Sequence, residues 1–297
     1  MFFPMVLITG AGRSGTGIAG RILGSSENTI FSYEPPWLPA IAALMAGKEL
    51  GDHAAKFLLE ICIHDLEFYP QLIGRKVSLR PGYSNSFNYL SWEELLRRLA
   101  LPDRRRDYQS LAGRGALRFV FKMPDVHLVL GKLLELFPQL KIIHLIRHGK
   151  DVIASGLGRQ WYTDEFYKNW VVTWFSPSGQ GEPACPSFVD EHYQKPWASW
   201  NPATRAAYSW TRMVRHGLDV AKAHPDRILT VKYEALAANV QQESQRLAQW
   251  AGLRLSALSY GHMNQLRDYE QVGHTHDFVI DGSFEKEFVK TLESCGY

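Results

Sequence analysis

The stretch that decides the fold reads Val6-Leu-Ile-Thr-Gly-Ala-Gly-Arg-Ser-Gly-Thr-Gly-Ile-Ala-Gly-Arg-Ile-Leu-Gly24. Its apolar start breaks into glycines, and apolar residues then return from Ile18 to Leu23 at helical spacing. This order predicts a strand, a tight loop and the first turns of a helix. Such a loop presents unpaired backbone N–H groups and the positive end of a helix dipole at one point. With the charge of Arg13 added, the stretch predicts a site for a phosphorylated ligand.

The loop alone fits more than one class of nucleotide-binding protein. Gly10, Gly12 and Gly15 spell the G-x-G-x-x-G pattern of dinucleotide-binding folds, and Glu34 follows near the place of a ribose-binding acid. Gly10 and Gly15 also have the Walker A spacing, but Thr16 stands where the lysine belongs. The further glycine and the Tyr-x-x-x-Lys motif of short-chain dehydrogenases are both absent. On the loop alone, a dinucleotide fold remains a fair hypothesis.

The composition is that of an ordinary globular protein and argues against several classes of function. Of the 297 residues, 45% are hydrophobic and 21% are charged, and the formal net charge is only +3. So weak a charge, without a basic stripe, argues against a nucleic-acid partner. No apolar run approaches a membrane span, and the apolar N-terminus is expected to be the first strand rather than a signal peptide. The three cysteines show neither pairing nor metal spacing, so a cytoplasmic location is expected.

Further apolar runs predict the rest of a sheet. Residues 140–146 are almost continuously apolar, which is typical of a central parallel strand buried on both faces. Shorter runs predict strands near residues 6–8, 29–32, 76–79, 118–122 and 227–234. With helical patterns between them, these runs predict a single α/β domain over residues 1–297, with a central, mostly parallel sheet flanked by helices.

Helical spacing accounts for much of the remaining chain. It predicts helices over residues 38–46, 53–66, 92–101, 203–223 and 236–251, and one more that begins after Asp125 as its N-cap. Residues 159–202 are rich in tryptophan and in turn-forming residues, so this segment is expected to be a substrate-binding or lid insertion. The tail after Gly252 shows few regular signals.

Polar residues follow several predicted strands, at the edge of a parallel sheet where ligands bind. Glu34 follows the second strand, flanked by aromatic residues and prolines that are expected to desolvate it partly. Lys122 ends one strand, and Arg147 ends the central strand. Ser155 comes about a turn into the next helix, so Arg147 and Ser155 are expected to converge on a second anion. His127 is expected to be a surface or capping histidine.

Taken in order, these motifs resemble those of the sulfotransferases that use 3′-phosphoadenylyl sulfate (PAPS). Residues 12–17, Gly-Arg-Ser-Gly-Thr-Gly, resemble the 5′-phosphosulfate loop in the form found in carbohydrate sulfotransferases. Residues 145–155 resemble the 3′-phosphate motif of the family. Shorter elements also match: Lys-x-Pro at 122–124, Tyr-Glu-x-Leu at 233–236 and Glu-Pro at 34–35. The resemblance implies a P-loop-like strand, loop and helix at the N-terminus.

The resemblance also implies a reaction, in which a sulfuryl group passes from PAPS to a hydroxyl or amine of a carbohydrate or another small-molecule acceptor. The product of the cofactor would be adenosine 3′,5′-bisphosphate (PAP). Glu34 would be the general base with His127 in reserve, and Arg13 and Lys122 would stabilise the transferred group. The residues implied to bind the cofactor are Gly12, Arg13, Ser14, Gly15, Thr16, Gly17, Arg147, Ser155 and Tyr233.

No metal is expected to take part in this reaction. A sulfuryl group carries a single negative charge, less than a phosphoryl group, so backbone N–H groups, Arg13 and Lys122 can serve where Mg²⁺ otherwise would. His274, His276 and Asp277 form an H-x-H-D pattern, which without further spaced ligands is a weak metal signal.

Two departures from the family pattern and two alternative functions remain. Gly17 stands where the family has a hydroxyl residue, and His148-Gly149 stand where it has Asp-Pro. One alternative is an NAD(P)-dependent Rossmann-type oxidoreductase, favoured by the glycine spacing. The other is a non-catalytic nucleotide-binding protein. The sequence leaves the acceptor and the oligomeric state open.

Overall fold

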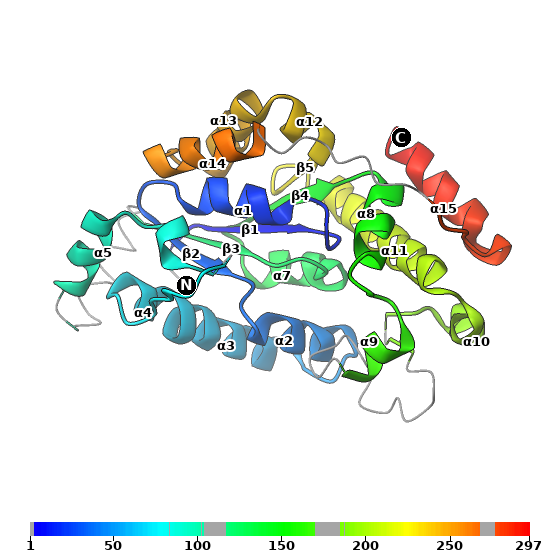
Figure 1. The fold of residues 1–297 in the computed structure, drawn as a ribbon. Coiled ribbons are helices and arrows are strands. Elements are labelled where there is room, and N and C mark those ends of the chain that lie inside the picture. The colour runs from blue at the N-terminus through cyan, green and yellow to red at the C-terminus, as the bar shows by residue number, and fades with distance from the viewer. Residues whose placement is uncertain are drawn as a thin grey trace.

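The strands lie in one parallel sheet with the order β2-β3-β1-β4-β5 (Figure 1). The structure, a computed structural model, describes residues 3–82, 84–101, 103, 117–169, 185–186, 188–267 and 277–297. The strands are β1 (Met5–Gly10), β2 (Thr29–Tyr33), β3 (Arg118–Lys122), β4 (Leu140–Ile146) and β5 (Ile228–Lys232). The predicted α/β fold is therefore confirmed, but residues 76–79 are irregular backbone and not a strand.

β1 lies at the centre of the sheet because every one of its residues can be buried. Its start, Met5, is in register with Phe119 of β3 on one side and with Leu140 of β4 on the other. All six residues of β1 are buried. A strand that is apolar on both faces is stable only between two layers of helices, and this requirement places the glycine-rich loop after Gly10 at the middle of one sheet edge.

Helices cover both faces of the sheet, as the sequence predicts. In chain order the described helical elements are α1 (Thr16–Gly24), α2 (Trp37–Ala46), α3 (Asp52–Ile61), η1 (Cys62–Phe68), α4 (Tyr69–Leu72), η2 (Ser86–Asn88), α5 (Trp92–Leu99), η3 (His127–Val129), α7 (Leu130–Leu136), α8 (Gly149–Leu157), α9 (Asp164–Asn169), α10 (Glu191–Ser199), α11 (Pro202–Ala223), α12 (Tyr233–Ala238), α13 (Val240–Ala251), α14 (Ala257–Arg267) and α15 (Gly282–Ser294).

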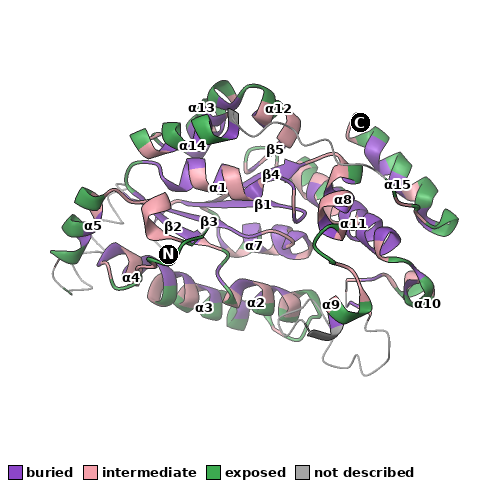
Figure 2. Cartoon of the chain, viewed as in Figure 1, coloured by how far each residue is buried: buried purple, intermediate pink, exposed green. Residues whose placement is uncertain are grey.

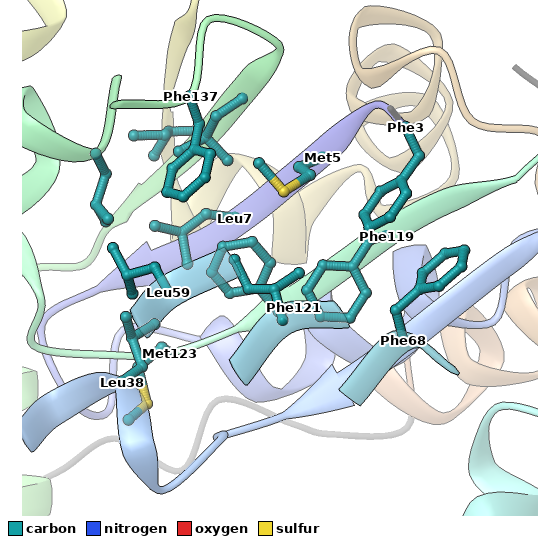
Figure 3. Packing of buried hydrophobic residues seen from close by; sticks show 14 of the residues in the cluster. Phe3, Met5, Leu7, Leu38, Leu59, Phe68, Phe119, Phe121, Met123 and Phe137 are labelled. Carbon is teal, nitrogen blue, oxygen red and sulfur yellow. The ribbon is translucent and has the colours of Figure 1, made fainter. Parts of the chain in front are cut away.

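Each face of the sheet has its own apolar cluster. Alternate residues of β1 point to opposite faces, so Leu7 joins one cluster and Ile8 the other. The cluster of Leu7 packs against α2, α3, α4 and α7, and Figure 3 shows its phenylalanines, among them Phe119 and Phe121, stacked beside β1. The cluster of Ile8 packs against α1, α13 and α14, which lie together on the other side of the sheet (Figure 1).

A third cluster joins the C-terminal tail to the domain. It contains the buried aromatic residues of α10 and α11 together with Phe284, Phe288 and Leu292 of α15. Figure 2 shows the buried face of α15 turned towards α8 and α11 and its exposed face turned outward. The tail therefore holds two regular helices, α14 and α15, contrary to the sequence reading. The apolar spacing of Phe284, Phe288 and Leu292, after the N-cap Asp281, is the signal that could have found α15.

Two further predicted helices differ from the observed ones. The helix expected over residues 53–66 continues past Ile61 as the π-helical segment η1 and then as α4. The helix expected over residues 236–251 is two helices, because Asn239 between α12 and α13 leaves the helical conformation with φ of −135°. Short helical segments with weak internal hydrogen bonding take their form from tertiary packing, which sequence spacing does not report.

The docking of α15 can be tested by removing one ring. Phe288 is 1% exposed and packs on Trp210 of α11, with 5.4 Å between the ring centroids. Phe288→Ala is expected to lower the free energy of unfolding by about 3–5 kcal/mol, because a buried ring is lost. The matched control is Val289→Ala, since Val289 is 42% exposed and its truncation should change stability by about 0.5 kcal/mol or less. Urea unfolding followed by circular dichroism measures both, and equal effects would contradict the docking.

Candidate active site

A cleft of about 410 Å³ opens at the carboxyl ends of the strands around β1. In the sheet, β3 and β2 follow on one side of β1, whereas β4 and β5 follow on the other. The order in which the chain adds strands therefore reverses at β1. In open α/β sheets, ligands bind in the crevice at such a switch point. Among the predicted site residues, those that line the cleft are Gly12, Arg13, Gly15, Thr16, Gly17, Glu34, Lys122, Arg147 and Tyr233.

The loop between β1 and α1 is held in a conformation that requires glycine. Gly15 has φ of +84°, and a Cβ added to it would lie 2.1 Å from the ring of Tyr233. Arg13 also has a positive φ, of 71°, which is uncommon for a residue with a side chain. Ser14, within the loop, is fully buried, and its backbone N–H donates to the carbonyl of Ala11 at 3.0 Å. The loop therefore passes so close to Tyr233 that no side chain fits between them.

Asp125 holds the other side of the loop, a role that the sequence did not reveal. Its carboxylate Oδ1 accepts the backbone N–H of Gly12 at 2.8 Å, and its own N–H donates to the carbonyl of Gly10 at 3.1 Å. The prediction that Asp125 caps the following helix is wrong: the residue before η3 is Val126, and Asp125 has φ of 60°. Burial raises the pKa of Asp125 to about 6, although the Gly12 N–H and the charge of Lys122 lower it.

Arg13, Arg147 and Ser155 meet beside the loop. The Nε–H of Arg13 donates to the hydroxyl of Ser155 at 3.0 Å, and Nη1 of Arg147 donates to the backbone carbonyl of Arg13 at 3.3 Å. The guanidinium of Arg147 also lies over the ring of Tyr233, 4.9 Å from its centroid. Ser155 thus reaches the cleft through Arg13, whereas Arg147 and Tyr233 line it directly.

Glu234 fixes the turn that carries Arg147. One of its carboxylate oxygens accepts the backbone N–H of His148 at 2.9 Å, and the other accepts the hydroxyl of Tyr297 at 2.7 Å. The imidazole of His148 accepts the N–H of Lys150 at 3.3 Å and so caps α8, in the place where the family usually has aspartate. The glutamate of the Tyr-Glu motif is therefore a structural link between α12, the β4–α8 turn and the C-terminus.

Lys122 and Glu34 form an ion pair across the ends of β3 and β2. The side chain of Lys122 is 5% exposed and that of Glu34 is 40% exposed, so the pair has a buried cation and a carboxylate that faces the cleft. Nζ of Lys122 also lies 4.8 Å from the centroid of the Tyr33 ring. Burial lowers the pKa of Lys122, and the charge of Glu34 opposes that change. Glu34 has φ of 47°, a strained conformation that turns its side chain into the cleft.

Comparison with known proteins agrees with this geometry. The sequence model of the sulfotransferase family matches residues 4–257. The chain belongs to the sulfotransferase family. The matched range runs from the start of β1 to the first residue of α14 and so contains every residue of the cleft except the two on α14. The chain matches none of the curated proteins with which it was compared.

Solved structures are similar to this sulfotransferase at low sequence identity. The sulfotransferase domain of the olefin synthase of Synechococcus PCC 7002 is 17% identical, with a TM-score of 0.51 and coverage of 99% of this chain and 94% of that one. The sulfotransferase domain of the curacin biosynthetic pathway is 16% identical, with a TM-score of 0.48 and coverage of 99% and 98%. Sulfotransferase STF1 of Mycobacterium tuberculosis H37Rv is 17% identical, with a TM-score of 0.47 and coverage of 98% and 77%.

His127 does not lie where the sequence placed it. It is fully buried, not at the surface, and its ring packs edge to face on that of His144 with 5.0 Å between centroids. Burial lowers the pKa of His127 well below its ordinary value. His127 is not among the described residues that line the cleft, so the sulfotransferase does not bring this reserve base to the site.

The cleft also contains residues that sequence reasoning missed. Arg21 lies one turn after Gly17 on α1, Trp161 packs against Gly12, and Gln265 and Leu266 come from α14. Only the tryptophan had a signal, as part of the aromatic-rich segment. Among the described residues there is room at Gly17 for the hydroxyl residue usual in sulfotransferases, because an added Cβ would have only the hydroxyl of Tyr33 within 4 Å, at 3.9 Å.

Several predictions fall on residues outside the described part of the chain. These are His274 and His276 of the H-x-H-D pattern and much of the aromatic-rich segment, from residue 170 to residue 184. Asp277 is described and exposed. Within the described ranges of the sulfotransferase, histidine, cysteine and acidic side chains form no cluster that could hold a metal ion. In the same ranges no helix has both the length and the apolar character needed to cross a membrane.

The raised pKa of Asp125 predicts an unusual dependence of stability on pH. Between its ordinary pKa of 3.8 and about 6, the folded sulfotransferase holds the proton of Asp125 more tightly than the unfolded chain does. The contribution of this group to stability is therefore lost as the pH rises through that window. Asp125→Asn keeps an oxygen for the Gly12 N–H and cannot ionise. Its free energy of unfolding is expected to exceed that of the wild type by up to about 3 kcal/mol at pH 7.5, and by little at pH 4.

Urea unfolding at the two pH values measures this difference. Asp281→Asn is the matched control, because a hydrogen bond from Ser283 lowers the pKa of Asp281 and gives the opposite sign. That variant should lose stability at pH 7.5 relative to pH 4. If Asp125→Asn instead changed stability equally at both pH values, the buried ionisation would be refuted.

Proposed function

We propose that this sulfotransferase transfers a sulfuryl group from PAPS to a hydroxyl, or an amine, of a carbohydrate or another small-molecule acceptor. The observation that carries the proposal is the convergence of Arg13, Lys122 and Arg147 on one cleft beside the carboxylate of Glu34. Family membership and fold support sulfuryl transfer in general. The unpaired, partly buried cysteines fit a reducing compartment, so we infer a cytoplasmic location.

The residues of the cleft fit a nucleotide that carries two anionic groups. Arg147 lines the cleft, and its Nε is buried without a hydrogen-bond partner among the described residues, so this N–H is available to a ligand. The loop with Arg13 and the N-terminus of α1 would hold the 5′-phosphosulfate. Arg147 would hold the 3′-phosphate, with Ser155 behind Arg13, and the ring of Tyr233 would lie beside the adenosine. When bound, PAPS supplies an activated sulfuryl group.

The protein's own groups divide the work of the reaction. Glu34 accepts the proton of the acceptor hydroxyl as the new S–O bond forms, because its carboxylate faces the cleft. Lys122 holds Glu34 in place and brings a positive charge to the transferred group from a buried position, where charge interactions are strong. The loop N–H groups and Arg13 stabilise the charge that develops on the leaving phosphate. These positions need no metal ion for the transfer step.

The two alternative functions explain less of the site. An oxidoreductase of the Rossmann type would leave the strand-tip Arg147 and the buried Lys122 without a role, and the family match argues against it. A non-catalytic nucleotide-binding protein would not need a glutamate with a strained backbone beside a buried lysine. The conformation of Glu34 costs free energy, and such strain is concentrated at functional sites.

PAP binding tests the cofactor assignment. Arg147→Ala is expected to weaken PAP binding by about 2–3 kcal/mol, because a charge-assisted contact is lost, and Ser155→Ala by less, because Ser155 acts through Arg13. Isothermal titration calorimetry measures both. The matched control is Arg246→Ala, an exposed arginine paired with Glu243, which should not change PAP affinity. Tighter binding of NADP than of PAP to the wild type would overturn the assignment.

Turnover tests the base. Glu34→Gln keeps an oxygen for Lys122 but cannot take a proton, so kcat is expected to fall by roughly two to four orders of magnitude. PAP affinity should be nearly unchanged, because other residues hold the cofactor. Glu27→Gln is the matched control: Glu27 is 46% exposed and paired with Arg254, outside the cleft. Turnover of labelled PAPS that survives in Glu34→Gln would show that Glu34 is not the base.

A further inference from the structure

A second cavity, of about 470 Å³, lies beside the cofactor cleft along the outer edge of β2. Its volume is typical of sites for small molecules. Tyr33, Pro35 and Pro36 line this cavity, whereas Glu34, between them in sequence, lines the cofactor cleft. Tyr33 is the residue common to the described linings of both. The candidate base therefore stands at the boundary between the two cavities.

The outer edge of β2 turns backbone hydrogen-bonding groups toward the second cavity. Towards β3, the N–H of Glu34 donates to Lys122 and the carbonyl of Asn28 accepts from Arg118, so even-numbered residues face β3. Because backbone groups alternate along a strand, those of Phe31 and Tyr33 face outward. The carbonyl of Thr29, another odd-numbered residue, also faces away from β3. It accepts from Nη2 of Arg98 at 3.0 Å.

The charged side chains that line the second cavity, among the described residues, form ion pairs with one another or with neighbours. Lys76 donates to Glu67 at 2.6 Å, Arg98 pairs with Glu94 at 2.7 Å, and Arg75 pairs with Asp103. Glu67 is 1% exposed and also accepts from Ser32 at 2.6 Å, from Trp37 at 3.1 Å and from Gln71 at 3.1 Å. An ionic ligand would compete with the partners already present in these pairs, so the described wall favours a neutral ligand.

Hydroxyl groups and aromatic rings make up much of the rest of the wall. Ser78, Ser84 and Ser86 line the cavity, and Phe31 and Tyr89 lie against each other there, with 4.3 Å between the ring centroids. The backbone of Ser78 is tied to Ser86 by bonds of 2.9 and 2.8 Å, which fixes this part of the wall. Aromatic side chains suit the C–H groups of a sugar, while hydroxyls and strand-edge backbone groups suit its hydroxyl groups.

We propose that this cavity is the acceptor site and that it takes a neutral, polyhydroxylated molecule of monosaccharide or disaccharide size. The proposal rests on the proposed function. An acceptor hydroxyl reaches past Tyr33 towards Glu34, and its oxygen forms a bond to the sulfur of PAPS. The bond between that sulfur and the bridging phosphate oxygen breaks, PAP leaves with the electron pair, and the hydroxyl proton passes to Glu34.

The test fills the cavity and measures sugar binding and turnover separately. The wild type is titrated with glucose, N-acetylglucosamine and maltose by saturation-transfer NMR, and then assayed with labelled PAPS and the same sugars. A phenol, an amino acid and a sugar phosphate are the comparison acceptors. Ser78→Trp and Ser84→Trp each place a large side chain in the cavity. They are expected to raise Kd and KM for the best neutral sugar at least tenfold and to leave PAP affinity unchanged.

Ser294→Trp is the matched control, because Ser294 is exposed at the end of α15, far from β2 (Figure 1). It should alter neither sugar binding nor PAP binding. Two tryptophan variants guard against a folding defect in one of them, and retained PAP affinity shows that the fold is intact.

Sugar binding that both variants weaken, without any turnover of PAPS, would support the cavity and refute the proposed function. PAP binding with preference for the phenol, the amino acid or the sugar phosphate, or sugar binding that neither variant alters, would refute the acceptor site.

Discussion

The close packing of the loop after β1 is the constraint on which the site depends. A Cβ on Gly10 would lie 2.4 Å from the carbonyl of Leu145, and one on Gly15 would lie 2.1 Å from the ring of Tyr233. The first contact sets the loop against β4, and the second sets it against α12. Because Arg147 follows β4 and stacks on Tyr233, the same two contacts place the strand-tip arginine beside the loop. The glycines therefore position side chains that are distant in sequence.

Burial shifts the pKa values of two neighbouring ionisable groups of the site in opposite directions. It lowers the pKa of Lys122, whose charged form is the cation, and raises the pKa of Asp125, whose charged form is the anion. Both changes favour the neutral form. A nearby anion favours a charged Lys122 and a neutral Asp125. It therefore opposes the lowering of the Lys122 pKa and adds to the raising of the Asp125 pKa. An anion bound near Lys122 would thus be opposed by fewer negative charges if Asp125 is neutral, while Glu34 is the counter-charge that pairs with Lys122 in this structure.

The sequence was enough to predict the five observed strands and the loop, because both follow from local patterns, although it also predicted a strand over residues 76–79 that the structure does not contain. Apolar runs marked the five observed strands, and motif spacing brought Arg13, Lys122 and Arg147 to one cleft. What it could not show depends on contacts between distant residues. Asp125 takes a left-handed conformation to reach Gly12, far away in the chain. His127 has a polar side chain that is nonetheless buried against His144. Neither follows from residue type or spacing.

In the proposed function, cofactor binding and acceptor recognition would use different kinds of structure. The cofactor cleft is built on strand ends and helix starts, which the buried sheet holds rigidly, whereas the second cavity is walled by the edge of β2 and by residues of the segment between α4 and α5, among them Ser78, Ser84 and Tyr89. Among described lining residues the two share Tyr33. If the second cavity holds the acceptor, as proposed, changes in its wall between α4 and α5 would alter which acceptor binds without disturbing the loop after β1. A strand edge also offers backbone groups that any hydroxylated ligand can use, so selectivity must come from the side chains opposite it.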